Sequence, residues 1–136
     1  MPKGSGEAEE IMTTSTLDPK LVASRCLEAW STGDFDAARA LLDDHVQFTG
    51  PLGHSEGADD YLDGVRGFAK SVKSIEQRRV FGEGDDVCIV YDIVTKGTTH
   101  AVPTAGWFRV RHGRIVAINA FFDVRALAPY PPEAGR

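Results

Sequence analysis

At 136 residues the chain is long enough for one domain with a single hydrophobic core and too short for two ordinary domains. Hydrophobic residues make up 42% of it and charged residues 26%, which is typical of a soluble globular protein and argues against a disordered or a membrane protein. The net charge is -5 and the basic residues form no dense cluster, so a nucleic acid is not an expected partner. No apolar run is long enough to cross a bilayer, so a membrane is not expected either.

The ends of the chain differ in composition from its middle. Residues 1–17 are rich in Gly, Ser, Thr and Glu without an apolar period, so we expect a flexible N-terminal tail, a domain over 18–128 and a second tail over 129–136. The first tail lacks the apolar segment of a secretory signal peptide, so the expected compartment is the cytoplasm. Cys26 and Cys88 have no CxxC spacing and should be free thiols. No metal-ligand spacing or Gly-rich phosphate loop occurs, and no metal or cofactor is expected.

Three helices are predicted in the first half of the chain. The first has Asp18 as its N-cap and Pro19 at its first position, and it ends before Gly33. Its apolar face consists of Leu21, Val22, Cys26, Leu27 and Trp30. Asp34 caps a second, short helix, and a third is predicted over 58–69, where the apolar spacing is helical although two glycines weaken it. The apolar stripe of the second helix is Phe35, Ala38, Leu41 and Leu42.

The remaining segments are predicted to be strands. A short strand over 45–49 ends at the turn-forming residues 50–53. Four longer segments are rich in β-branched and aromatic residues and are joined by turns typical of hairpins. These segments are 72–81, 87–95, 99–111 and 114–124. Helices followed by an antiparallel meander predict an α+β fold.

Several motifs match one known family. Residues 25–34 (RCLEAWSTGD) are similar to its first helix and "GD" turn, and 43–53 (DDHVQFTGPLG) look like its first strand and Pro-Gly loop. The stretches GTTH, WFRV and GRIV resemble its last long hairpin; they lie at 97–100, 107–110 and 113–116.

In this order and spacing, the motifs resemble the SnoaL-like family of the nuclear transport factor 2-like superfamily from about Asp18 to Leu127. The resemblance implies three N-terminal helices packed on a strongly curved antiparallel β-sheet, which together form a cone with an apolar pocket. The superfamily includes polyketide cyclases, ketosteroid isomerases, limonene epoxide hydrolases and non-catalytic binding or dimerisation proteins. It therefore implies a fold and no single activity.

The residues that carry the known reactions of the superfamily are not retained. By the resemblance, the tyrosine, the base and the buried acid of ketosteroid isomerases fall on Cys26, Gly50 and Gly106, which supply neither a phenol nor a carboxylate. The water-holding pair and the last-strand aspartate of limonene epoxide hydrolases fall on Phe48, Gly50 and Ala120. Neither mechanism is expected in its known form, and a rearranged site stays open.

Three other residues are the candidates for catalysis: His100, Tyr91 and Asp92. Tyr91 and Asp92 face opposite sides of one strand; the family register favours Tyr91 inward, with Asp92 then paired on the outer face. His100 is in phase with the pocket row of the next strand, unless Pro103 breaks that row, and an imidazole suits acid–base work near neutral pH. The alternative is a solvated or structural histidine. His54 is either a contact at the pocket mouth or an exposed turn residue.

A mostly apolar wall with few polar groups suits a hydrophobic small molecule, polyketide- or terpenoid-like by the family resemblance. The residues expected to line the pocket and bind this ligand are Cys26, Trp30, Phe48, Tyr61, Val102, Phe108 and Phe122. One hypothesis is a cofactor-independent cyclase or isomerase that works by acid–base chemistry. The alternatives are a non-catalytic ligand-binding or dimeric accessory protein, and an epoxide hydrolase with a rearranged site. We expect a homodimer through the outer face of the sheet, where Cys88, Val90 and Val94 would otherwise be exposed.

Overall fold

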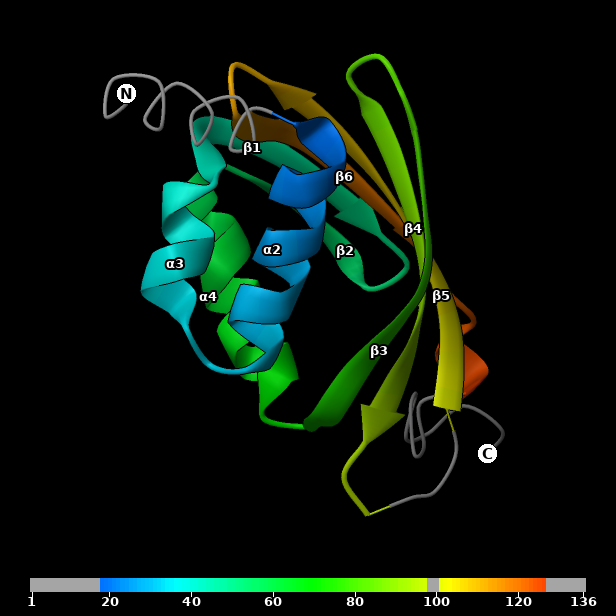
Figure 1. Cartoon of the computed structure of the whole chain (residues 1–136). Helices are drawn as coiled ribbons and strands as arrows, with labels where there is room; N and C mark the ends of the chain where they lie inside the picture. Colours follow the sequence, from blue (N-terminus) through cyan, green and yellow to red (C-terminus); the bar gives the residue numbers. More distant parts are fainter. Residues whose placement is uncertain (1–17, 98–100, 127–136) are drawn as a thin grey trace, which may run out of the picture.

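The computed structural model describes residues 18–97 and 101–126, in which three helices pack on one face of a six-stranded sheet (Figure 1). The helices are α2 (Pro19–Ser31), α3 (Phe35–Ala40) and α4 (Ala58–Ala69), and a 3₁₀ turn, η1 (Val124–Ala126), follows the last strand. The strands are β1 (Leu42–Gly50), β2 (Gly53–Glu56), β3 (Val72–Glu83), β4 (Asp86–Thr95), β5 (Ala101–Arg111) and β6 (Arg114–Phe121). The predicted α+β class with three helices is confirmed.

The first two helices begin where their caps predict. The Asp18 carboxylate accepts a hydrogen bond from the Lys20 amide at 3.1 Å, and the Asp34 carboxylate accepts one from the Ala37 amide at 3.1 Å. The second helix is shorter than predicted, because Leu42 already belongs to β1. The Leu42 side chain is fully buried, as a core residue would be in a helix or in a strand. The apolar pattern alone therefore does not tell the end of a helix from the start of a strand.

The sheet has the strand order β2-β1-β6-β5-β4-β3, and its neighbouring strands are antiparallel except for the parallel pair β1 and β6. The prediction of an all-antiparallel sheet is wrong at that one pair. It is also wrong to treat the residues after Gly53 as a loop, because they form β2, with Phe48 opposite Ser55 and Thr49 opposite His54. The turn at Pro51 and Leu52 folds the chain back on β1, and this short polar strand has no apolar alternation by which the sequence could reveal it.

The faces of the central strands follow the register that the family resemblance favours. On β4, Val87, Ile89, Tyr91 and Ile93 are buried on the inner face, and the residues between them are partly exposed on the outer face. Tyr91 pairs with Thr104 and Asp92 with Pro103, without a register shift between β4 and β5. Pro103 therefore does not break the row. β6 ends opposite Ala105, so within residues 18–97 and 101–126 the proline lies on a part of β5 that pairs with β4 alone, where a missing amide proton is tolerated.

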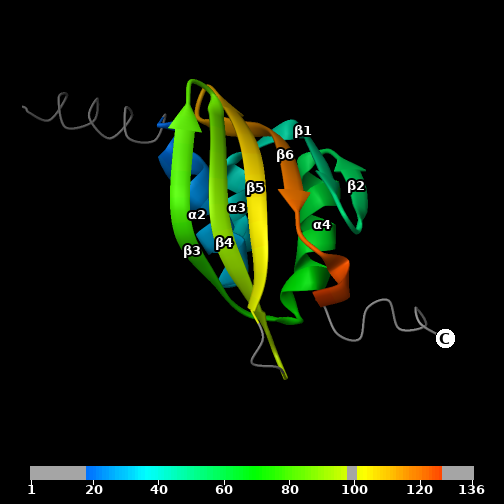
Figure 2. The ribbon, with the colours of Figure 1, turned by 90° about the vertical axis from the view of Figure 1, so that its right-hand side faces the viewer.

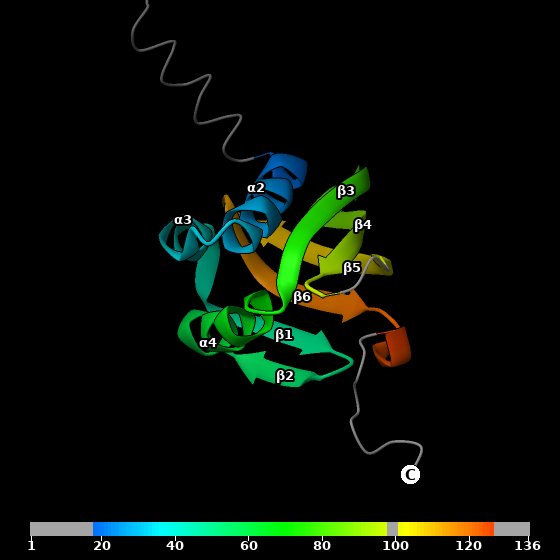
Figure 3. The same cartoon turned by 90° about the horizontal axis from the view of Figure 1, so that it is seen from below.

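The sheet is strongly bent and is not closed. Figure 2 shows β3 to β6 side by side with the helices behind them, and Figure 3 shows the sheet curling around the helical side. Register shifts interrupt the pairing of β3 with β4 and of β5 with β6, and such irregularities increase the local bend of a strand. At the far end of the sheet, Ser24 of α2 and Gln77 of β3 exchange two hydrogen bonds, of 2.7 and 3.1 Å. The helices and the bent sheet thus enclose one interior.

Among the described residues, no helix is long and apolar enough to cross a membrane.

Candidate functional site

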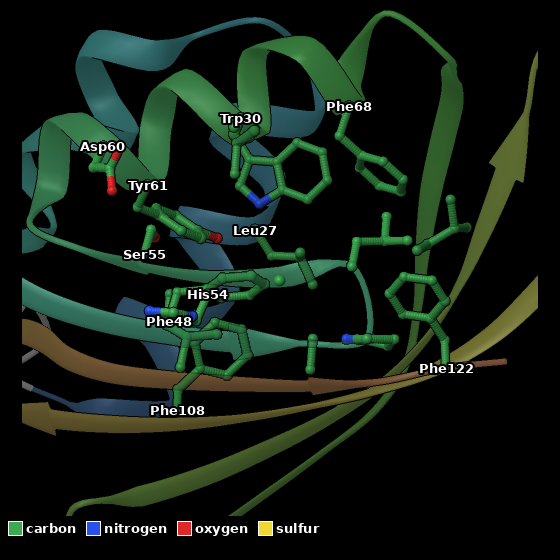
Figure 4. A pocket seen from close by; sticks show the side chains of 18 of the residues that line it. Leu27, Trp30, Phe48, His54, Ser55, Asp60, Tyr61, Phe68, Phe108 and Phe122 are labelled. Atoms are coloured by element: carbon green, nitrogen blue, oxygen red, sulfur yellow. The ribbon is translucent and has the colours of Figure 1, made fainter. Parts of the chain in front are cut away.

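A cavity of about 340 Å³ lies between α2, α4 and the concave face of the sheet (Figure 4). Aliphatic and aromatic side chains make up most of its wall. The aromatic ones come from two helices, three strands and the segment after β6; they are Trp30, Phe48, Tyr61, Phe68, Tyr91, Phe108 and Phe122. Residues far apart in the sequence therefore meet around one apolar space.

Neighbouring rings pack against one another along this wall. The ring centroids of Phe48 and Tyr61 are 5.2 Å apart, which joins β1 to α4. Those of Trp30 and Phe68 are 6.2 Å apart, and those of Phe68 and Phe122 are 6.5 Å apart. These tilted arrangements have the separations at which aromatic pairs attract one another. The contacts fix the shape of the cavity.

The two tyrosines of the wall are deeply buried, each with 6% of its surface exposed. Burial raises the pKa of Tyr91, and it raises the pKa of Tyr61 well above its ordinary value, with a further contribution from the nearby Cys26 and Tyr91. Both phenols therefore stay protonated over the physiological pH range and can donate a hydrogen bond. The cavity has polar groups in its interior, and these groups are neutral.

Three more polar side chains border the cavity: His54, Ser55 and Asp60. His54 and Asp60 are exposed, whereas the Ser55 hydroxyl oxygen is buried and has no hydrogen-bond partner. The sequence raised His54 as a possible mouth contact but offered no signal for Ser55, because β2 was not predicted. Asp60 precedes Tyr61 in the first turn of α4, where an acidic residue is also favoured simply by the helix dipole.

Most of the residues predicted to contact a ligand lie on the cavity wall. These are Trp30, Phe48, Tyr61, Phe108 and Phe122. Cys26 and Val102 are each 1% exposed and belong to the surrounding core, and they do not line the cavity. Cys26 lies close enough to Tyr61 to affect the pKa of its phenol, so it forms part of the layer behind the wall.

The structure describes two of the three predicted catalytic residues, and these two lie on opposite faces of β4. Tyr91 lines the cavity. Asp92 lies on the outer face of the sheet, where its carboxylate accepts a hydrogen bond of 3.0 Å from the Arg78 guanidinium. His100 lies outside the described residues. Of the three, Tyr91 alone is placed at the cavity by the structure.

Aromatic rings lie against Gly50 and Gly106, the two positions on which the carboxylates of ketosteroid isomerases fall by the family resemblance. A Cβ atom added at Gly50 would lie 2.8 Å from Cζ of Phe48. One added at Gly106 would lie 2.9 Å from Cε1 of Phe108 and 3.4 Å from Cε1 of Tyr91. In both cases the ring belongs to a residue two positions away on the same strand face, and it leans over the glycine. The space for an acid is therefore filled, and the loss is not a simple deletion.

Among the described residues, no group of three or more His, Cys, Asp or Glu side chains could bind a metal ion. The ionisable side chains on the cavity wall are His54, Asp60 and the two tyrosines.

Known proteins with the same architecture extend these observations. The family model of the SnoaL-like domain matches residues 23–118 of this chain. A nuclear transport factor 2-like protein of unknown function from Cytophaga hutchinsonii is 28% identical, with a TM-score of 0.71, over 82% of this chain and 95% of that one. A protein from Kribbella flavida is 25% identical, with a TM-score of 0.74, over 84% of this chain and 91% of that one.

A protein from Catenulispora acidiphila with a ketosteroid isomerase-like fold, in complex with trimethylamine, is 19% identical, with a TM-score of 0.67, over 77% of this chain and 87% of that one. Its likeness concerns the fold alone. Comparison with curated proteins finds no significant match. The family match gives a fold and names neither an activity nor a substrate. On the match over most of its length, the chain belongs to the SnoaL-like domain family.

Proposed function

We propose that this protein binds an uncharged, largely apolar small molecule in the cavity between α2, α4 and the sheet. The observation that carries this proposal is the cavity itself: about 340 Å³ of space, walled mainly by aromatic and aliphatic side chains. Ligand sites in proteins have this size and composition, with a few polar groups that orient the ligand. A polyketide- or terpenoid-like ring compound fits this description.

The charge state of the wall favours an uncharged ligand. Tyr61 and Tyr91 are held neutral by burial, and the ionisable His54 and Asp60 are exposed at the edge of the cavity. A charged ligand group inside would lose its hydration without gaining an ionic partner, which is strongly unfavourable. Binding should therefore depend on burial of apolar surface.

A cofactor-independent cyclase or isomerase is the second candidate. It is favoured by the Tyr91 phenol, which can donate a hydrogen bond to a developing oxyanion inside the cavity. Such chemistry also needs a base, and on the described wall this would be His54 or Asp60 at the edge of the cavity. Gly50 and Gly106 offer no carboxylate, so ligand binding without turnover is the better supported function.

The test uses N-phenyl-1-naphthylamine, an uncharged apolar probe that becomes fluorescent in a dry site. We expect saturable binding at micromolar probe concentration. Ala120→Leu should weaken it at least tenfold, because residue 120 lines the cavity and the larger side chain would fill it. Ala37→Leu, on the exposed side of α3, is the matched control and should bind the probe as the natural protein does. No saturable binding, or equal affinity in all three proteins, would contradict the proposal.

A further inference from the structure

Ser55 has a feature that the packing of the fold does not explain. Among the buried side-chain nitrogen and oxygen atoms of the described residues, its hydroxyl oxygen is the one without a hydrogen-bond partner. Leaving such a group unpaired costs about 1–3 kcal/mol. Most buried polar groups in native proteins have a partner, so an exception points to a partner outside the chain.

Backbone pairing on both sides holds Ser55 in place. Ser55 lies on β2 directly opposite Phe48 of β1, and it lines the cavity. Just beyond β2, the Gly57 amide donates a hydrogen bond of 2.7 Å to the Val46 carbonyl, which ties the end of the hairpin to β1. The ladder on one side of Ser55 and this bond on the other keep its side chain at the cavity wall.

The cavity differs in polarity from one end to the other. Figure 4 shows Ser55, Tyr61, His54 and Asp60 at one end, together with the rings of Phe48 and Phe108, and Phe68 and Phe122 at the other end. The latter two rings pack together, with their centroids 6.5 Å apart. A ligand that matches both ends has a polar group near β2 and an apolar body that extends toward Phe68.

We infer that the Ser55 hydroxyl anchors the polar end of the ligand, and that this ligand is an apolar ring compound with one uncharged oxygen group, a hydroxyl or a carbonyl. The inference rests on the proposed binding function and adds the class and orientation of the ligand. A serine hydroxyl both donates and accepts, so it serves either oxygen group. A carboxylate or phosphate is disfavoured, because its charge would lose hydration at the buried Ser55 hydroxyl and would lie at the same end of the cavity as the Asp60 carboxylate.

The test compares three naphthalene probes by isothermal titration calorimetry at neutral pH: 2-naphthol, 2-acetylnaphthalene and the apolar 2-methylnaphthalene. The affinity of each oxygen-bearing probe is divided by that of 2-methylnaphthalene, so that the ratio reports on the oxygen group. Ser55→Ala should lower this ratio about fivefold for at least one of them, the loss expected for one hydrogen bond. It should leave the affinity for 2-methylnaphthalene unchanged or higher. The probe whose ratio falls identifies the oxygen group.

The matched control is Thr49→Val, which removes an exposed hydroxyl from the same hairpin and should leave all ratios as they are. If Ser55→Ala leaves both ratios unchanged, water satisfies this hydroxyl and the inference is wrong. If the substitution weakens all three probes equally, Ser55 shapes the hairpin and does not contact the oxygen group, which also overturns the inference. If the natural protein binds none of the probes, the proposed binding function fails as well.

Discussion

Single residues determine which chemistry the cavity can support. Cys26 occupies the position that a catalytic tyrosine would take by the family resemblance, and it lies behind the wall with 1% of its surface exposed. The phenols nearest the ligand space belong instead to Tyr61 on α4 and Tyr91 on β4. The phenol donors of this pocket thus come from α4 and β4, whereas the resemblance pointed to a position on α2.

The buried thiol of Cys26 should make the stability of the protein decrease at alkaline pH. Burial raises its pKa to about 12, whereas a free thiol ionises near about 8.5. Between these values the unfolded chain has lost the proton and the folded chain has kept it. The stabilisation is therefore complete below pH ~8.5 and decreases as the pH rises toward the folded-state pKa.

Between pH 7 and pH 10, the free energy of unfolding of the natural protein should fall by about 1–2 kcal/mol more than that of Cys26→Ala. Urea unfolding of both proteins at the two pH values measures this difference. Lysine and arginine residues contribute equally to both proteins, so their effects cancel. An equal loss of stability in the two proteins would mean that the Cys26 thiol ionises alike in the folded and unfolded states.

At the scale of elements, the sequence predicted those features that depend on local patterns. Asp18 and Asp34 marked two helix starts, and the register implied by the family resemblance favoured Tyr91 inward on β4. The parallel pairing of β1 with β6 joins segments far apart in the sequence, and β2 is a short polar strand without apolar alternation, so local apolar patterns reveal neither.

The same distinction applies to the site. Five of its aromatic residues were expected there, because large apolar residues are buried and the family resemblance implied which elements surround the pocket. Ser55 was not predicted to line the cavity. It lies on a strand of four residues that forms only by pairing with β1.

The inner face of β5 offers a test of how tightly the wall is packed. Gly106→Ala should lower the free energy of unfolding by about 1–3 kcal/mol, because the added methyl group overlaps the Phe108 ring. The matched control is Gly67→Ala in α4, where nothing lies within 4 Å and helix propensity favours alanine by up to about 1 kcal/mol. Urea unfolding should therefore give changes of opposite sign. A stable Gly106→Ala protein would show that Phe108 can move aside and that the wall is loosely packed.

On the whole molecule, the outer face of the sheet carries a second apolar surface. Four residues form this surface, which we call the outer patch: Phe81, Cys88, Trp107 and Phe121. Phe81, Trp107 and Phe121 are 54%, 43% and 56% exposed, and Cys88 lies between Phe81 and Trp107 on adjacent strands. Exposed aromatic groups of this kind mark interaction surfaces.

Polar contacts within the chain accompany the outer patch. Asp86 accepts hydrogen bonds of 3.0 Å from the Trp107 indole and 3.1 Å from the Arg109 guanidinium, which holds the tryptophan ring in place. Asp92 and Arg78 form a further ion pair on the same face. Charges of both signs thus lie on the same face as the apolar centre, and a two-fold homodimer would bring this one surface against itself.

We therefore predict a homodimer through the outer patch. Light scattering after size-exclusion chromatography should give twice the mass of one chain at about 50 micromolar, a range in which ordinary interfaces of standard size are occupied. Trp107→Glu and Phe81→Glu should each shift the protein toward the monomer, whereas Ala40→Glu on the exposed side of α3 should not. Cys88 supplies an independent measurement, because dimerisation would cover its thiol while Cys26 is buried in either state. Its labelling by N-ethylmaleimide should become slower as the protein concentration rises. A single-chain mass together with a labelling rate that does not depend on concentration would contradict the dimer.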